Sequence, residues 1–150
     1  MDLVNVSKET REIVLSSLKR IDYKNCVDGI RPTSIEGKIV SDADMCDAIG
    51  ANGILRTHKY GMKFGRVFFN KESNPDADMN INEYKEKVSG CCVHHMFEKL
   101  FKLKGLMITD SGKKEASNRH ELMVKFLYQL FDEEEADNWK EYLDNYLANL

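Results

Sequence analysis

The residues best suited to chemistry in this chain are three aspartates that stand close together among small and apolar residues. Asp42, Asp44 and Asp47 belong to the stretch "SDADMCDAIG", residues 41–50. On a helix, Asp44 and Asp47 share one face while Asp42 points elsewhere. Carboxylates among apolar neighbours are unfavourable unless they are paired, hydrogen-bonded or bound to a cation, and oxygen ligands suit Mg²⁺ or Mn²⁺. The spacing alone leaves a second interpretation open, in which the aspartates only stabilise the positive N-terminal end of a helix.

A basic cluster follows the aspartates by about three helical turns. The segment "RTHKYG" contains Arg56, His58 and Lys59. An acidic cluster beside a basic one suits a metal ion that holds a phosphate, because arginine and lysine bind the remaining phosphate oxygens. The combination indicates a ligand that carries phosphate.

The segment "CCVHHMFEK", residues 91–99, has the residue types of a zinc site but not its spacing. Zinc ligand pairs are usually two to four residues apart, whereas adjacent helical residues point in different directions. We therefore expect no zinc site here. His95 and Lys99 instead share one face at i and i+4, and this pair has two interpretations: part of an anion site, or a surface pair near Glu98.

Composition and charge exclude several classes of function. The net charge is −3 over 150 residues, so we expect no non-specific nucleic-acid binding, which depends on clustered lysine and arginine. No apolar run is long enough to cross a bilayer, and the N-terminus lacks the pattern of a secretory signal. The four cysteines form no CxxC pair. These features predict free thiols and a cytoplasmic location.

Helical periodicity predicts an all-α fold and a single domain over residues 1–150. Ser34 is a good N-cap for a helix that begins near Ile35 and includes the aspartates. Residues 64–80 are rich in Gly, Asn, Asp and Ser, and we expect a long loop or lid there. Helical patterns return over 81–107 and from Asp110 onward. The final apolar stripe, from Trp139 to Leu150, favours a core helix over a partner surface.

Two long segments resemble bacterial HD-domain phosphohydrolases. The first is "IEGKIVSDADMCDAIGANGILRTHKYG", which begins at Ile35. The second is "HMFEKLFKLKGLMITDSGKKEASNRHELMVKFLYQLFDE", which begins at His95. Together they span about residues 35–135 in the order and at the separation found in that family. The resemblance implies an HD-domain-like helical bundle that cleaves phosphate ester or anhydride bonds of nucleotides with a divalent metal, Mn²⁺ or Mg²⁺.

The resemblance also implies roles for individual residues. Asp44 corresponds to the catalytic metal-binding aspartate of the family, and Asp42 to a supporting or alternate metal ligand. Asp47 is expected to buttress the helix. The expected phosphate-binding positions are Arg56, His95, Lys99 and Arg119.

The chain departs from the family pattern upstream of the aspartates. The family carries a histidine and a His-Asp pair there, whereas the first histidine of this chain is His58 and no His-Asp dipeptide occurs. Met45 and Cys46 also replace a common Arg-Leu pair. One aspartate alone cannot hold Mg²⁺ or Mn²⁺ well. We therefore expect an N-terminally incomplete HD domain that is weak or inactive alone.

Two further hypotheses follow from that incompleteness. A degenerate HD domain would act as a non-catalytic nucleotide-binding or protein-interaction module. A purely helical interaction protein would use its C-terminal stripe. Missing N-terminal helices would expose apolar surface, which predicts a homo-oligomer or a partner chain that covers it.

Overall fold

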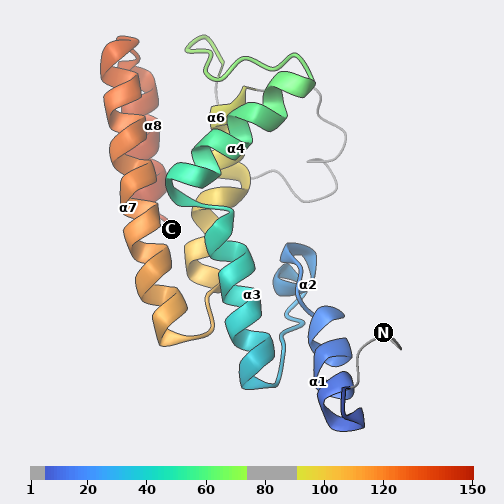
Figure 1. The fold of residues 1–150 in the computed structure, drawn as a ribbon. Helices are drawn as coiled ribbons and strands as arrows, with labels where there is room; N and C mark the ends of the chain where they lie inside the picture. Colours follow the sequence, from blue (N-terminus) through green and yellow to red (C-terminus); the bar gives the residue numbers. More distant parts are fainter. Residues whose placement is uncertain (1–5, 74–90) are drawn as a thin grey trace.

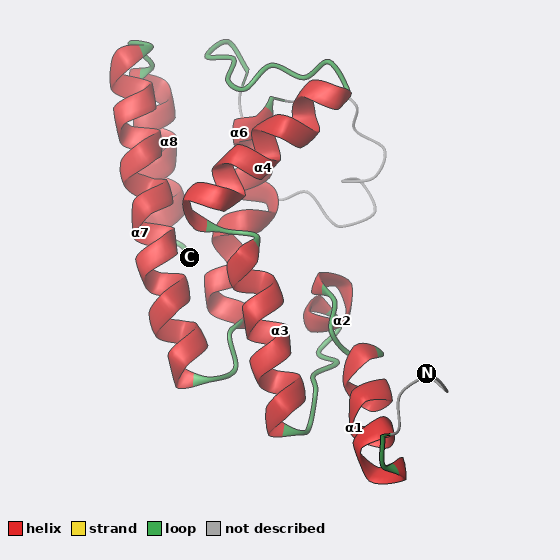
Figure 2. Ribbon diagram, in the orientation of Figure 1, coloured by secondary structure: helices red, strands yellow, loops and turns green. Residues whose placement is uncertain are grey.

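The computed structural model describes residues 6–73 and 91–150, and every regular element in these ranges is helical (Figures 1 and 2). The prediction of an all-α fold is therefore confirmed. The elements are α1 (Lys8–Leu18), α2 (Tyr23–Val27), α3 (Ile35–Asp47), α4 (Gly50–Lys63), α6 (Cys92–His95), the π-helix η1 (Met96–Leu100), the 3₁₀-helix η2 (Phe101–Leu106), α7 (Asp110–Glu133) and α8 (Asp137–Ala148).

Local capping residues determine where the main helices begin. The Ser34 hydroxyl accepts a hydrogen bond from Gly37 N–H at the start of α3, which confirms the expected N-cap. The Thr109 hydroxyl accepts one from Gly112 N–H at the start of α7. Both caps satisfy backbone donors that the first helical turn leaves without an intrahelical partner.

The core lies where α7 and α8, which run side by side in Figure 1, meet the η1 and η2 segments. Its largest fully buried side chains include four aromatic rings, Trp139, Phe97, Phe101 and Phe131. Trp139 contacts Phe97 and Phe131 with ring centroids 6.1 and 5.6 Å apart. The predicted stripe is core at Trp139 and Leu143, which are fully buried, whereas Leu150 at its end is 54% exposed.

A tight junction joins α3 to α4. Gly50 begins α4 with φ +78°, a left-handed conformation that favours glycine, and the Arg119 side chain from α7 packs against it. A Cβ at position 50 would lie 3.0 Å from Arg119 Cγ. Beyond the junction α4 packs against α7 and runs away from α3 (Figure 1).

Two predicted segments differ from the structure. Residues 91–107 do not form one regular helix, because the chain passes from α6 into a π-helix and then a 3₁₀-helix. Helix α4 extends to Lys63, and residues 64–73 form the described part of the expected loop. Residues 74–80 of that loop and 81–90 of the expected helix lie outside the described residues.

The N-terminal helices leave apolar side chains on the surface. Helices α1 and α2 lie at one end of the bundle in Figure 1, and α1 packs against α3. The exposed apolar side chains of α1 and α3 are Val14, Leu15, Leu18, Ile35, Ile39 and Val40. We call these six residues the α1–α3 apolar surface. In the described part of the chain, no helix is long and apolar enough to cross a membrane.

Candidate functional site

A pocket of about 390 Å³ opens between α3, α4 and the α6–η1 segment. Its wall contains four of the six side chains that were expected to form the site. The lining residues are Asp44, Ala48, Arg56, Thr57, Tyr60, Gly61, Arg66, Cys92, His95, Lys99 and Leu100. The pocket therefore brings together Asp44, Arg56, His95 and Lys99, but not Asp42 or Arg119.

Asp44 is an exposed side chain on α3, one helical turn before Ala48. Among the described residues that line the pocket, it is the single carboxylate. Lys99 of η1 lines the same pocket. The negative charge of Asp44 acts to raise the pKa of this lysine. Asp44 thus places one negative charge beside a cation at the pocket wall.

Arg56 is held at the pocket wall by Asp47. Its Nη1 donates to Asp47 Oδ2 at 2.7 Å, and its Nη2 donates to the Asp47 carbonyl oxygen. These bonds join the last residue of α3 to the second turn of α4. Asp47 therefore fixes the position of an arginine, which fits the buttressing role expected of it.

His95 and Lys99 reach the same pocket from the α6–η1 segment. Burial, followed by the positive charges of Lys99 and Arg66, lowers the pKa of His95 to about 4. His95 is therefore neutral at pH 7. The π-helix Met96–Leu100, which begins directly after His95 and contains Lys99, forms a wider turn than an α-helix, and π-helical turns are frequent at functional sites.

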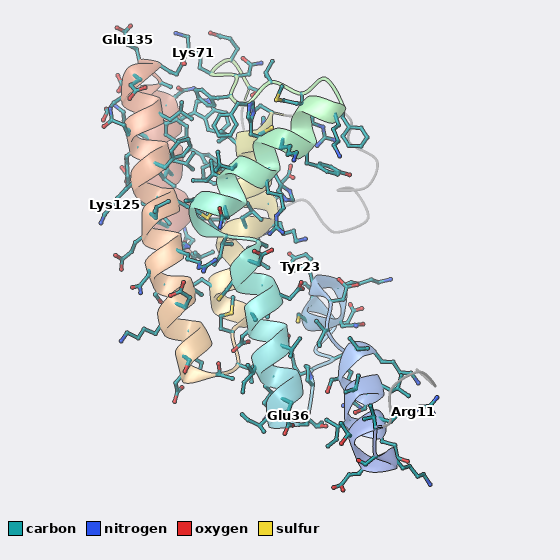
Figure 3. All side chains as sticks on the ribbon, in the orientation of Figure 1. Arg11, Tyr23, Glu36, Lys71, Lys125 and Glu135 are labelled. Atoms are coloured by element: carbon teal, nitrogen blue, oxygen red, sulfur yellow. The ribbon has the colours of Figure 1, made fainter. Side chains whose placement is uncertain are left out.

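Lys99 lies against an aromatic ring. Its Nζ is 4.7 Å from the centroid of Tyr23, a residue at the start of α2 (Figure 3). Burial lowers the pKa of Lys99, and the positive charge of Arg56 acts in the same direction. The negative charges of Asp22 and Asp44 act to raise it. A half-buried ammonium group gains more from a bound anion than an exposed one, because water screens it less.

Several pocket residues were not predicted from the sequence. Arg66 reaches the wall from the loop after α4, where its backbone N–H donates to Gly61 O at 3.0 Å. No periodic pattern could have placed it there. Tyr60 was detectable, because it follows Arg56 by four residues and so shares its face of α4.

Asp42, expected as a supporting or alternate metal ligand, does not line the pocket. Its carboxylate accepts hydrogen bonds from Ile108 N–H at 2.9 Å, from Thr109 N–H at 2.7 Å and from the Thr109 hydroxyl at 2.7 Å. Gly112 packs against the same carboxylate, and a Cβ there would collide with it. The buried Asp42 therefore holds the start of α7 and lies outside the pocket.

Arg119, expected to bind phosphate, also lies outside the pocket lining. Its Nη1 donates to Cys46 O at 2.8 Å and its Nε donates to Glu115 Oε1 at 2.6 Å. These bonds and its packing on Gly50 join α7 to the α3–α4 junction. In this position Arg119 holds helices together.

The described residues do not fit a resident divalent metal. Nowhere in 6–73 and 91–150 do three or more His, Cys, Asp or Glu side chains gather closely enough to hold an ion. The other histidines of the "CCVHH" segment and α7 point into the core, His94 against Trp139 and His120 against Phe101. Mg²⁺ and Mn²⁺ need several oxygen ligands, and this pocket supplies one carboxylate.

Comparison with known proteins gives the class of fold. No protein-family model matches the chain. A protein of Lactobacillus plantarum has a TM-score of 0.72 at 32% identity, covering 90% of this chain and 63% of that one. An HD-superfamily hydrolase of Bacillus thuringiensis has a TM-score of 0.68 at 35% identity, covering 90% of this chain and 58% of that one. The chain therefore has an HD-like helical fold.

A particular relative is YpgQ of Bacillus subtilis. It is 33% identical over 126 residues, which are 83% of this chain and 53% of YpgQ. The crystal structure of YpgQ in complex with ADP has a TM-score of 0.63 at 29% identity, covering 86% of this chain and 55% of that one. The chain thus covers less than two thirds of the length of each of these three proteins, from 53% for YpgQ to 63% for the Lactobacillus plantarum protein.

Proposed function

We propose that this chain is an HD-like domain whose pocket binds the phosphate groups of a nucleotide or of another phosphorylated small molecule. The observation that carries the proposal is the gathering of Arg56, Arg66 and Lys99 at one pocket, beside the neutral His95. The ADP bound to YpgQ supports a nucleotide as the ligand.

The charges at the pocket favour an anion. Asp47 holds Arg56 in place, so that this arginine loses little side-chain entropy when it binds a ligand. Hydrogen bonds from a charged donor to an anion contribute about 1.5–3 kcal/mol each. Arginine and lysine can therefore bind phosphate oxygens here without a bridging metal ion.

Hydrolysis is the finer part of the proposal. The resemblance to HD phosphohydrolases implies metal-dependent cleavage of phosphate ester or anhydride bonds, with Asp44 as the metal ligand. Since the described residues add no further carboxylate to the pocket, we propose that the chain alone hydrolyses nucleotides weakly or not at all. Groups outside the described residues would have to complete a Mn²⁺ or Mg²⁺ site around Asp44.

A non-catalytic module is the second candidate function. It is favoured by the same observation that the described residues form a cationic pocket without a metal-ligand cluster. The α1–α3 apolar surface would then serve self-association or a partner chain. We propose a cytoplasmic location because all four cysteines are free and buried.

Binding of inorganic pyrophosphate tests the proposal directly. Isothermal titration calorimetry in EDTA should give saturable binding to the wild-type chain, and Lys99→Met should weaken it about tenfold, since one charge-assisted contact is lost. Lys125→Met is the matched control, because Lys125 lies on the side of α7 that faces away from α4 (Figure 3). Equal affinity in wild type and Lys99→Met, or no binding at all, would contradict the proposal.

A further inference from the structure

Helix α4 and its C-cap residue, Phe64, carry two exposed aromatic rings beside the cationic pocket. Tyr60 lines the pocket, yet 60% of it is exposed, and Phe64 is 58% exposed. Their ring centroids are 4.9 Å apart with an interplanar angle of 48°. The two rings thus form a continuous aromatic surface that the fold does not bury.

The spacing along α4 sets where this surface lies relative to the phosphate-binding side chains. Arg56 and Tyr60 are four residues apart and share one face of α4, and the Phe64 ring at the C-cap contacts the Tyr60 ring. The rise of an α-helix places Tyr60 about 6 Å along the axis from Arg56, and Phe64 lies beyond Tyr60 at the end of the helix. In a nucleotide the sugar lies between the phosphates and the base, and it spans a distance similar to that between Arg56 and Tyr60.

We propose that Tyr60 and Phe64 form a stacking surface for the base of a nucleotide whose phosphates lie against Arg56 and Lys99. This inference rests on the proposed function of the pocket and adds the nucleobase to it. Stacking on an aromatic side chain tolerates every base, because each base has a π-face. The surface should therefore raise the affinity for nucleotides over free polyphosphate without strong selection among bases.

The chemistry of the neighbouring residues favours a base over another apolar occupant. Arg66 lies in the loop after α4, and its backbone N–H donates a hydrogen bond to Gly61 O. Its side chain lines the same pocket. Tyr60 therefore lies within a wall that also carries Arg56, Thr57 and Arg66. A ligand that combines an aromatic ring with negative charge suits this wall better than an apolar peptide does.

Comparing ADP with pyrophosphate separates the base from the phosphates. We expect ADP to bind the wild-type chain about tenfold more tightly than pyrophosphate, which is within the range for stacking on one aromatic side chain. Tyr60→Ala should remove most of that advantage and leave pyrophosphate affinity within about twofold. Tyr60→Phe should retain it, because stacking requires the ring and not the hydroxyl.

Leu55→Ala is the matched control, because Leu55 is an exposed apolar residue of α4 outside the pocket lining. It should leave the affinity for both ligands unchanged. Circular dichroism checks the folding of each variant. Phe64→Ala is a second test that leaves Tyr60 intact, and it should also reduce the advantage of ADP over pyrophosphate.

Two results would overturn the inference. If pyrophosphate binds and ADP binds no more tightly, or if Tyr60→Ala weakens both ligands equally, the stacking surface is wrong while the phosphate site stands. If neither ligand binds, the proposed function fails together with it.

Discussion

His95 lies within reach of two positive charges, Lys99 on η1 and Arg66 on the loop after α4. Burial and these two cations together lower its pKa to about 4. A neutral imidazole beside a lysine and an arginine avoids a third positive charge in one pocket. A bound phosphate would reverse this effect, because its negative charge favours the imidazolium form.

The lowered pKa of His95 predicts how the free energy of unfolding depends on pH. In the unfolded chain a histidine titrates near 6.5, so between about pH 6.5 and pH 4 the unfolded state binds more protons than the folded state. The contribution of His95 to stability is therefore complete above pH 6.5 and decreases as the pH falls toward 4. His120, also lowered to about 4 by burial and then by Lys104, adds to the same trend.

Urea unfolding at several pH values between 4 and 7.5 measures this effect, with His95→Gln as the comparison. The variant should lose less stability on acidification than the wild type does, because one of the two shifted histidines is gone. NMR should show the His95 imidazole titrating near pH 4. Titration near 6.5 would mean that His95 is not held in the buried, cationic setting described above.

Residue type and spacing were sufficient to predict part of the candidate site. Asp44, Arg56, His95 and Lys99 lie in three separate stretches of sequence, and the structure brings them to one pocket. Arg66 could not be predicted, because only the path of the loop after α4 brings it back to Gly61. Their binding roles remain proposals.

At the scale of elements, two polar side chains join α7 to α3, the helix that carries Asp44. Asp42 connects α3 to the start of α7 through Ile108 and Thr109, and Arg119 connects α7 to the end of α3. From the sequence, both residues were candidates for binding a ligand. Residue type alone does not show whether a carboxylate or a guanidinium binds a ligand or a backbone group of the same chain. Only the fold shows which partner is present.

Removing the Asp42 carboxylate should destabilise the chain. Asp42→Ala leaves the N–H groups of Ile108 and Thr109 without their acceptor in a buried setting, and we expect a loss of about 3 kcal/mol, or roughly 10 °C in Tm. Differential scanning calorimetry measures it. Asp44→Ala is the matched control, since Asp44 is exposed and its loss should change stability by less than about 0.5 kcal/mol. Equal Tm values for the two variants would refute the structural role of Asp42.

Local signals predicted where helices begin better than how they continue. The N-cap serine, Ser34, acts on the next few residues and was found from sequence, as was the core position of Trp139 from its helical period. The π-helix at Met96–Leu100 was not, because an apolar pattern does not distinguish it from an α-helix. Packing of Phe97 and Leu100 into the core accompanies that change of helix type.

At the scale of the whole molecule, apolar side chains stay exposed on the N-terminal helices. The α1–α3 apolar surface includes Leu18 and Ile39, which are 58% and 54% exposed. A surface of this kind promotes association, because burial of apolar area is favourable at about 25 cal/mol per Å². The chain also spans little more than half of YpgQ, so additional segments are part of that relative.

We predict that the chain self-associates through this surface. Size-exclusion chromatography with light scattering should show a mass above that of the monomer, and the double variant Leu18→Lys, Ile39→Lys should shift it to the monomer. Leu122→Lys, at an exposed apolar position on α7, should leave the association state unchanged. A monodisperse wild-type monomer would count against self-association and leave a separate partner chain as the occupant.

The central claim is that the pocket of this HD-like chain binds phosphate through its own cations and without a metal ion. The most direct measurement is ADP binding by calorimetry, once in EDTA and once in Mn²⁺, for the wild type and Asp44→Ala. We predict dissociation constants within about twofold in all four titrations, because arginine and lysine carry the binding. Binding that requires Mn²⁺ and disappears in Asp44→Ala would contradict the claim and show that Asp44 holds a metal ion.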